Sequence, residues 1–183
     1  MQHKDQHINQ LLSRCKNGEK SAQLEIYKRY YRAMYNTALR ILNNSFDAED
    51  MMQESFLIAF TKLGTFKGEV TFGAWLKRIV INKCLTQLKK NKRLEEVKLE
   101  VAREESIGIE SHDYTDVNVN QILNTINQLK ENYRVAITLH LIEGFDYEEV
   151  SQIMNISYEN SRTTVSRAKN KLRQLLCQET ITT

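Results

Sequence analysis

The sequence contains no proline in 183 residues and only six glycines. At the average usage of about 5%, a chain of this length would carry roughly nine prolines. Because proline and glycine mark the frequent turns of β-sandwiches and β-barrels, their scarcity argues against an all-β fold. The chain is therefore predicted to be all-α, with long helices and few turns.

The overall composition is that of a folded globular protein, with 41% hydrophobic and 27% charged residues. No stretch approaches the roughly 18 consecutive apolar residues that cross a bilayer, and the first residues lack the apolar core of a secretory signal. These features predict a cytoplasmic protein without stable membrane insertion. At about 150 residues per domain, the length allows one domain or two small ones.

The three cysteines, Cys15, Cys84 and Cys177, lie far apart and form neither a CxxC pair nor a cluster with histidines. We interpret them as reduced structural thiols and expect no metal site. The histidines do not form an HExxH pattern, and the sequence has no glycine-rich phosphate loop. The chain is therefore not expected to be an enzyme, and no cofactor is expected.

Charge is distributed in blocks along the chain. The segment 77–93 carries seven cations and no anion, and the segment 162–173 carries five cations and no anion. Between them, the segment 95–116 contains eight acidic residues. A basic block can be a solvated helix face or can follow a phosphate backbone. Two basic blocks on either side of an acidic connector suit two DNA-contacting modules on a tether that DNA repels.

The acidic segment also interrupts the hydrophobic periodicity of the chain, most clearly around residues 106–115. Loss of periodicity together with a reversal of charge is typical of a linker. We therefore expect a first domain at residues 1–94, an acidic linker at 95–117 and a second domain at 118–183.

Within the first domain, apolar residues at helical spacing predict a long helix that ends at Asn43 and Asn44. Its predicted core face consists of Leu24, Tyr27, Tyr31, Met34, Tyr35, Ala38 and Leu42. The next helix is predicted to begin at the segment SFDAED, with Asp47 as its cap and with Glu49 and Asp50 in its first turn.

The segment LGTFKGEVTFGAW follows this acidic helix and holds three of the six glycines. It is predicted to form a loop whose ends are anchored by Phe66 and Phe72. The helix after the loop is predicted to be amphipathic. Its exposed basic side contains Arg78, Asn82, Lys89 and Arg93.

The C-terminal segment DYEEVSQIMNISYENSRTTVSRAKNKLRQLL indicates two helices joined by a short turn. Asp146 and Glu149 have the spacing of a capping box, Asn155 can adopt the left-handed conformation that ends a helix, and Ser157 can cap the second helix. The exposed side of the second helix carries groups suited to base edges and phosphates. These residues are Arg162, Thr163, Ser166 and Arg167.

Four segments together resemble a known family, in their order and spacing. They are DAEDMMQESFLIAF, FKGEVTFGAWLKRIVINKCL, EGFDYEEVSQIMNIS and SRAKNKLR. They are similar to the two conserved domains of bacterial RNA polymerase sigma factors of the extracytoplasmic-function group. The resemblance covers residues 21–176, and it implies a σ2-like helical bundle joined by a flexible linker to a σ4-like helix-turn-helix domain.

The resemblance implies a promoter-specificity subunit that docks on core RNA polymerase, at the β′ clamp helices and the β flap, and opens promoter DNA. It also implies an anti-sigma factor as an inhibitory partner. The residues implied to bind the clamp helices are Asp47, Glu49, Asp50, Gln53 and Glu54. The residues implied to contact the minus-10 element are Phe66, Lys67, Gly68, Glu69 and Val70 of the loop, with Arg78, Asn82 and Lys83 of the following helix. The residues implied to read the minus-35 element are Arg162, Thr163, Ser166 and Arg167.

The chain departs from the family at the start of the second helix of the helix-turn-helix. Where the family has a Gly-Thr-Val-Lys-like segment, this chain has Glu159, Asn160, Ser161 and Arg162. A serine in place of an inward-facing aliphatic residue predicts looser packing at position 161. Glu159 could contact a cytosine amino group or stabilise the positive end of the helix dipole, and we favour the dipole interpretation.

Two other classes of function are alternatives to this hypothesis. A two-domain transcriptional regulator would keep the helix-turn-helix but would need an effector pocket in residues 1–94, where the sequence offers none. An enzyme would need a catalytic or metal-binding pattern, and the acidic residues instead lie at helix starts or in the linker.

Overall fold

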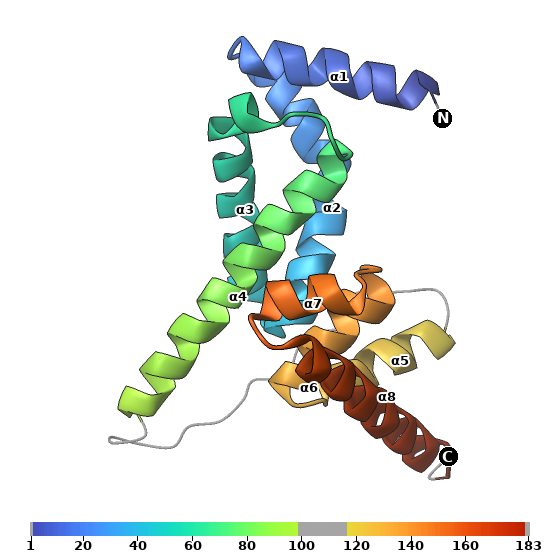
Figure 1. Cartoon of the computed structure of the whole chain (residues 1–183). Coiled ribbons are helices and arrows are strands. Elements are labelled where there is room, and N and C mark those ends of the chain that lie inside the picture. Colours follow the sequence, from blue (N-terminus) through green and yellow to red (C-terminus); the bar gives the residue numbers. More distant parts are fainter. Residues whose placement is uncertain (1, 99–116, 182–183) are drawn as a thin grey trace. The chain divides into compact units, whose positions relative to one another are not determined.

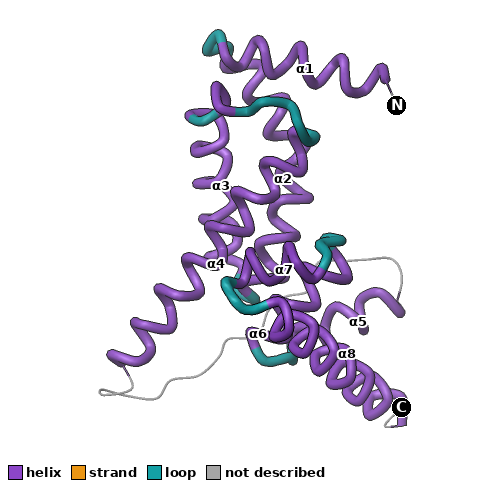
Figure 2. Tube along the Cα trace, in the orientation of Figure 1, coloured by secondary structure: helices purple, strands orange, loops and turns teal. Residues whose placement is uncertain are grey.

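The computed structural model describes residues 2–98 and 117–181, and these residues form helices without any strand (Figure 2). The all-α prediction is therefore confirmed. The chain divides into two compact units, residues 1–102 and 103–183 (Figure 1). The expected linker lies largely outside the described residues, and the helix before it continues to Lys98, four residues past the expected end of the first domain.

The described residues of the first unit form four α-helices and a short 3₁₀ helix, in the order α1 (Gln2–Lys16), α2 (Lys20–Leu42), α3 (Ser45–Thr61), η1 (Leu63–Thr65) and α4 (Phe72–Lys98). Helices α2, α3 and α4 pack against one another, and α1 packs against α2 and η1. The core between the three long helices contains large side chains that are almost completely buried. Among them are Ile26, Met34, Ile41, Leu76 and Ile81. The outer sides of α3 and α4 are exposed.

Helix α1 is held on the first unit by both apolar and charged contacts. Leu11, Leu12 and Cys15 are buried. The guanidinium of Arg14 donates to the carboxylate of Glu19 just before α2, with an Nε to Oε2 distance of 2.7 Å. This hydrogen bond is the main reason that the pKa of Glu19 is lowered to about 2.

The core face of α2 agrees with the prediction at Met34, Ala38 and Leu42, which are buried, and differs from it at other positions. Leu24 and Tyr31 are 52% and 42% exposed, whereas Ala22, Ile26 and Thr37 are buried. At about 100° per residue, Ile26 and Thr37 lie on the side of the helix opposite to Leu24 and Tyr31. The aromatic periodicity therefore traced the edge of the buried face rather than its centre.

The start of α3 also differs from the prediction. The cap is Asn44, whose side-chain oxygen accepts the backbone N–H of Asp47 at 3.0 Å. Asp47 lies in the first turn and is the acidic residue nearest the positive end of the helix dipole, while Glu49 and Asp50 lie further along. The end of α2 agrees with the prediction, since Asn43 adopts the left-handed conformation with φ of 54°.

The second unit contains α5 (Val117–Asn127), α6 (Glu131–Ile137), the π-helix η2 (Thr138–Ile142), α7 (Tyr147–Met154) and α8 (Tyr158–Ile181). Its core joins the end of α5, the end of α6 and the middle of α8. The residues at its centre are Ile126, Leu129, Ile137, Ala168 and Leu172. This core supports α8 along one side and leaves the opposite side exposed.

The cysteines divide into two groups. Cys15 and Cys84 are buried, and burial raises the pKa of both thiols, that of Cys84 to about 12. Their interpretation as structural thiols agrees with this burial. Cys177 is a free cysteine as well, but it is exposed on α8.

Candidate functional sites

Helices α7 and α8 form the predicted helix-turn-helix, and its local signals are observed. The backbone N–H of Glu149 donates to Asp146 Oδ1 at 2.8 Å, and that of Asp146 donates to Glu149 Oε2 at 3.0 Å, which completes the capping box. Asn155 ends α7 with φ of 55°. Ser157 Oγ accepts the backbone N–H of Asn160 at the start of α8. The turn is therefore fixed by local hydrogen bonds.

Ser161 joins the two helices of this motif. Its side chain is fully buried, and its hydroxyl lies 2.8 Å from the carbonyl oxygens of both Tyr147 and Tyr158, to either of which it can donate. Tyr147 begins α7, so this contact bridges the starts of the two helices. The small side chain therefore gains hydrogen bonds that an aliphatic residue could not make, and the looser packing expected at position 161 stays a prediction.

We expect Ser161→Ala to destabilise the α7–α8 pair by about 1 kcal/mol, because it removes a buried hydrogen bond and leaves its acceptors without that donor. Native-state hydrogen exchange of the full chain measures this as faster exchange in α7 and α8. Ser166→Ala is the matched control, since Ser166 is exposed on the same helix. Equal protection in both variants would show that the Ser161 hydroxyl does not hold the helices together.

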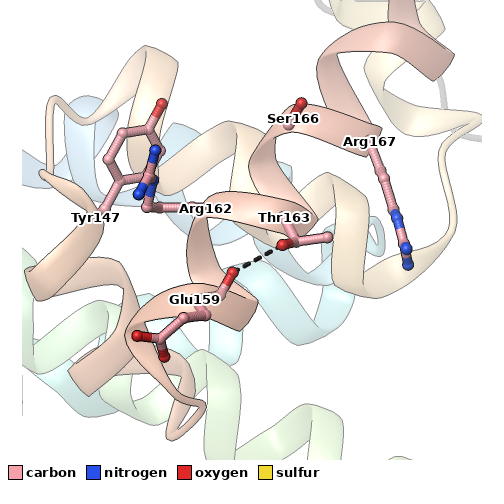
Figure 3. A pocket seen from close by; sticks show the side chains of 6 residues that line it. All are labelled: Tyr147, Glu159, Arg162, Thr163, Ser166 and Arg167. Atoms are coloured by element: carbon pink, nitrogen blue, oxygen red, sulfur yellow. Dashed lines mark hydrogen bonds between the residues drawn. The ribbon is translucent and has the colours of Figure 1, made fainter.

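The four residues predicted to read DNA lie together on the exposed side of α8. They line a hollow of about 660 Å³ with Tyr147 and Glu159 (Figure 3). The Thr163 hydroxyl donates to the carbonyl oxygen of Glu159 at 2.8 Å, so its hydrogen is used within the helix. The guanidinium carbon of Arg162 lies 5.8 Å from the centre of the Tyr158 ring. The arrangement presents two guanidinium groups and two hydroxyl groups from one helix face.

Tyr147 is the residue of this surface that the sequence analysis missed. Its ring stacks on His140 with centroids 4.5 Å apart, and it faces the same hollow as Arg162 (Figure 3). Its position directly after the capping residue Asp146 places it at the start of α7, and the contact of this helix start with Ser161 of α8 is seen only in the structure.

The acidic residues expected to bind polymerase differ in their exposure and in their hydrogen bonds on α3. Glu49 and Asp50 are exposed, and Glu49 Oε1 accepts a hydrogen bond from Gln53 Nε2 at 3.1 Å. Asp47 Oδ2 instead accepts from Asn91 Nδ2 of α4 at 3.0 Å. Glu49, Asp50 and Gln53 are therefore exposed on the outer side of α3, whereas Asp47 connects α3 to α4.

Glu54 and Lys83 form an ion pair between α3 and α4. The family resemblance implies different roles for these residues, polymerase binding for Glu54 and DNA binding for Lys83. Their side chains are 43% and 30% exposed, respectively, so the pair lies at the surface. In this structure the two side chains therefore bind each other.

The loop between η1 and α4 is anchored as predicted, by aromatic packing. The ring centroid of Phe66 lies 5.8 Å from that of Phe72 and 5.3 Å from that of Trp75. The ring centroid of Tyr30, on α2, lies 5.5 Å from that of Phe72. The four residues after Phe66 are exposed, and Gly68 has φ of +79°, a conformation that favours glycine. Phe66 thus supports the loop, while residues 67–70 form its accessible part.

The outer side of α4 exposes the predicted basic residues. Arg78, Asn82, Lys89 and Arg93 are all exposed, and they follow one another along the helix at intervals of about one or two turns. No carboxylate is found on this helix from Phe72 to Leu94. The face can therefore follow a phosphate backbone over several turns.

No group of three or more His, Cys, Asp or Glu side chains in residues 2–98 and 117–181 could hold a metal ion. None of the described helices is long and apolar enough to cross a membrane.

Comparison with known proteins gives the same division into two units. The family model of Sigma-70 region 2 matches residues 26–94, and that of Sigma-70, region 4 matches residues 120–172. The ECF RNA polymerase sigma-E factor of Haemophilus influenzae is 30% identical over 182 residues, which cover 91% of this chain and 95% of that protein. The ECF RNA polymerase sigma factor SigW of Bacillus subtilis is 29% identical, with 92% and 96% covered.

Two solved structures are similar over most of the chain. The sigma factor RpoE of Bartonella quintana, in complex with the anti-sigma factor NepR, has a TM-score of 0.65 and 27% identity, and the match covers 83% of this chain and 94% of that one. CnrH, in complex with the cytosolic domain of CnrY, has a TM-score of 0.55 and 23% identity, with 92% and 96% covered. The second match is a likeness of fold.

Proposed function

Since this chain belongs to the extracytoplasmic-function group of RNA polymerase sigma factors, which recognise promoters for transcription initiation, we propose that its two units divide promoter recognition between them. The observation that carries this proposal is that each unit exposes its own DNA-suited surface. In the first unit it is the basic face of α4, and in the second it is the reading side of α8. A protein of this kind is a binding subunit and not an enzyme.

The second unit reads the minus-35 element through the major groove. A rigid helix is the element that fits this groove, and α8 is supported by the core on its opposite side. Arg162 and Arg167 supply donors for guanine edges or phosphates, and Thr163 and Ser166 supply shorter polar contacts. Glu159 lies in the first turn of α8, which agrees with a role in stabilising the helix dipole.

The first unit contacts the minus-10 element with its loop and with α4. Opening the duplex unstacks bases at a cost of a few kcal/mol per step, and a protein pocket for an extruded base offsets this cost. Lys67, Gly68, Glu69 and Val70 form the accessible loop, and Phe66 supports it. Arg78 and Asn82 lie on the adjacent helix, and Lys83 joins them when its pairing with Glu54 is released.

Core RNA polymerase binds the outward side of α3. Glu49, Asp50 and Gln53 are exposed there and suit a basic partner surface, namely the β′ clamp helices of the family resemblance. The second unit contacts the β flap. Asp47 and Glu54 contribute less directly, because each is engaged with α4 in the free factor.

The remaining parts of the proposal concern domain boundaries, location and control. The domains are residues 1–94 and 118–183, and the acidic segment between them keeps the connector away from DNA. The protein works in the cytoplasm, where polymerase and promoters meet. An anti-sigma factor controls it, as NepR accompanies the Bartonella sigma factor.

Reconstituted transcription tests this function. Core polymerase with the purified chain is expected to initiate at specific fragments in a promoter pool, and core polymerase without it is not. A transcriptional regulator cannot give initiation to core polymerase that lacks a sigma factor. Absence of specific initiation from all fragments, with active core and folded protein, would favour the regulator alternative.

A further inference from the structure

Helix α3 exposes two large apolar side chains that the fold does not use. Phe46 is 86% exposed and Leu57 is 68% exposed, more than any other large apolar residue among those described. Single exposed apolar residues are ordinary on protein surfaces. Two on one helix that is also expected to bind a partner call for a shared explanation.

The two residues lie on the same stripe of the helix. Helical geometry places residues 46 and 57 about 20° apart around the axis and about 16 Å apart along it. Asp50 and Gln53 fall between them within about 40° of the same line, and Glu49 lies at about 60°. We name these five residues, Phe46, Glu49, Asp50, Gln53 and Leu57, the α3 face.

The side chains of the α3 face are presented by a rigid element. Ala48, Met52 and Phe56, on the other side of α3, are buried in the core of the first unit. The start of the helix near Phe46 is fixed by the Asn44 cap, and Gln53 is held by its hydrogen bond to Glu49. A preorganised surface of this kind loses little conformational entropy on binding.

The composition of the α3 face is that of an interface rather than of a solvated helix side. Carboxylates in its centre provide charge complementarity to a basic partner, which governs the rate and specificity of association. Aromatic and aliphatic side chains that enter pockets on the partner provide most of the binding energy in typical interfaces. Carboxylates alone would leave the exposure of Phe46 and Leu57 unexplained.

We propose that Phe46 and Leu57 are the apolar anchors of the contact with core RNA polymerase, one at each end of the α3 face. The inference rests on the proposed function of α3 and adds the chemistry of its partner. The polymerase surface that receives it carries two apolar sites about 16 Å apart, with cations between them that face Glu49 and Asp50. The α3 face is long and straight, and a helical segment of the partner could lie along it.

Binding of full-length variants to core polymerase, measured at several salt concentrations, tests this proposal. Phe46→Ala and Leu57→Ala are each expected to weaken binding by about tenfold at every salt concentration. Asp50→Asn is expected to weaken binding mainly at low salt, because it removes a charge that salt screens. Leu24→Ala is the matched control, since Leu24 is 52% exposed on α2 and lies outside the α3 face.

The outcomes separate this inference from the proposed function. If Asp50→Asn weakens binding but both anchor variants bind like the wild type, the carboxylates bind polymerase and the anchor proposal is wrong. If all three variants bind like the wild type, the assignment of α3 to polymerase also fails. A wild-type dimer in sedimentation that Phe46→Ala converts to monomer, with polymerase binding unchanged, would show that a second copy covers these side chains instead.

Discussion

Reversing the charge of Asp50 is expected to abolish binding of core RNA polymerase while leaving the factor folded. Asp50 is exposed in the centre of the α3 face, so Asp50→Arg places a cation against a partner surface that we expect to be basic. Losing the attraction and adding repulsion should cost about 3 kcal/mol or more, which is more than about 100-fold in affinity. A pull-down of core polymerase and a titration with labelled factor measure this loss.

The stability of the variant distinguishes a lost contact from a lost fold. An exposed charge away from the core changes the free energy of unfolding by about 0.5 kcal/mol or less, so thermal unfolding should match the wild type. Glu25→Arg on α2 is the control for charge reversal, since Glu25 is exposed and its hydrogen bond with His7 lies at the surface. Full polymerase binding by folded Asp50→Arg would remove Asp50 from the interface.

Glu54→Arg tests the same surface in a different way. Glu54 is paired with Lys83, so its replacement both removes a carboxylate and releases a lysine next to the basic face of α4. The result would therefore combine a change at the polymerase surface with a change at the DNA surface. For this reason Asp50, and not Glu54, is the residue that isolates polymerase binding.

The parts of the fold that were correctly predicted depend on local signals. The capping box of Asp146 and Glu149, the left-handed Asn155 and the Ser157 cap each involve residues within a few positions of one another. Hydrogen bonds of this type are decided by the residue types and their spacing, so the sequence contains the necessary information.

The errors arose where tertiary packing decides the outcome. Leu24 and Tyr31 have the spacing of a buried stripe, but the buried side of α2 is centred on other residues, among them Ala22, Ile26 and Thr37. Asn44 and Asp47 are both good capping residues, and the end of α2 at Asn43 determines which of them begins α3. Periodicity alone could not choose between these alternatives.

The functional residues show the same limit. The exposed sides of α4 and α8 could be predicted, because a solvated face requires only the helical period. The pairing of Glu54 with Lys83 and the bridge from Ser161 to Tyr147 join different helices, and their partners depend on how those helices cross. The sequence could therefore indicate which residues are accessible, but not which of them bind each other in the free factor.

Replacing Arg162 with alanine is expected to weaken recognition of the minus-35 element at one base pair. Arg162 is exposed on the reading side of α8 and lines the same hollow as Tyr147 (Figure 3). Its guanidinium also lies near the Tyr158 ring. A bidentate contact to guanine contributes about 1 to 3 kcal/mol of discrimination, so Arg162→Ala should lose that amount on the correct promoter and relax the preference at one position. Holoenzyme binding to matched and single-base-changed promoters measures both effects.

The matched control is a cation on the basic face of α4, the surface of the first unit that is proposed to contact DNA. Lys89 is exposed on the basic face of α4. If it contacts phosphate, Lys89→Ala should weaken binding to all promoter sequences alike. It should also lower the slope of log affinity against log salt concentration by about one unit. The contrast depends on what each cation meets, because phosphates are the same in every promoter whereas base edges differ. A uniform loss across all sequences for Arg162→Ala would make Arg162 a backbone contact. Specificity at the minus-35 element would then rest on Thr163, Ser166 or Arg167, the remaining residues of the α8 surface.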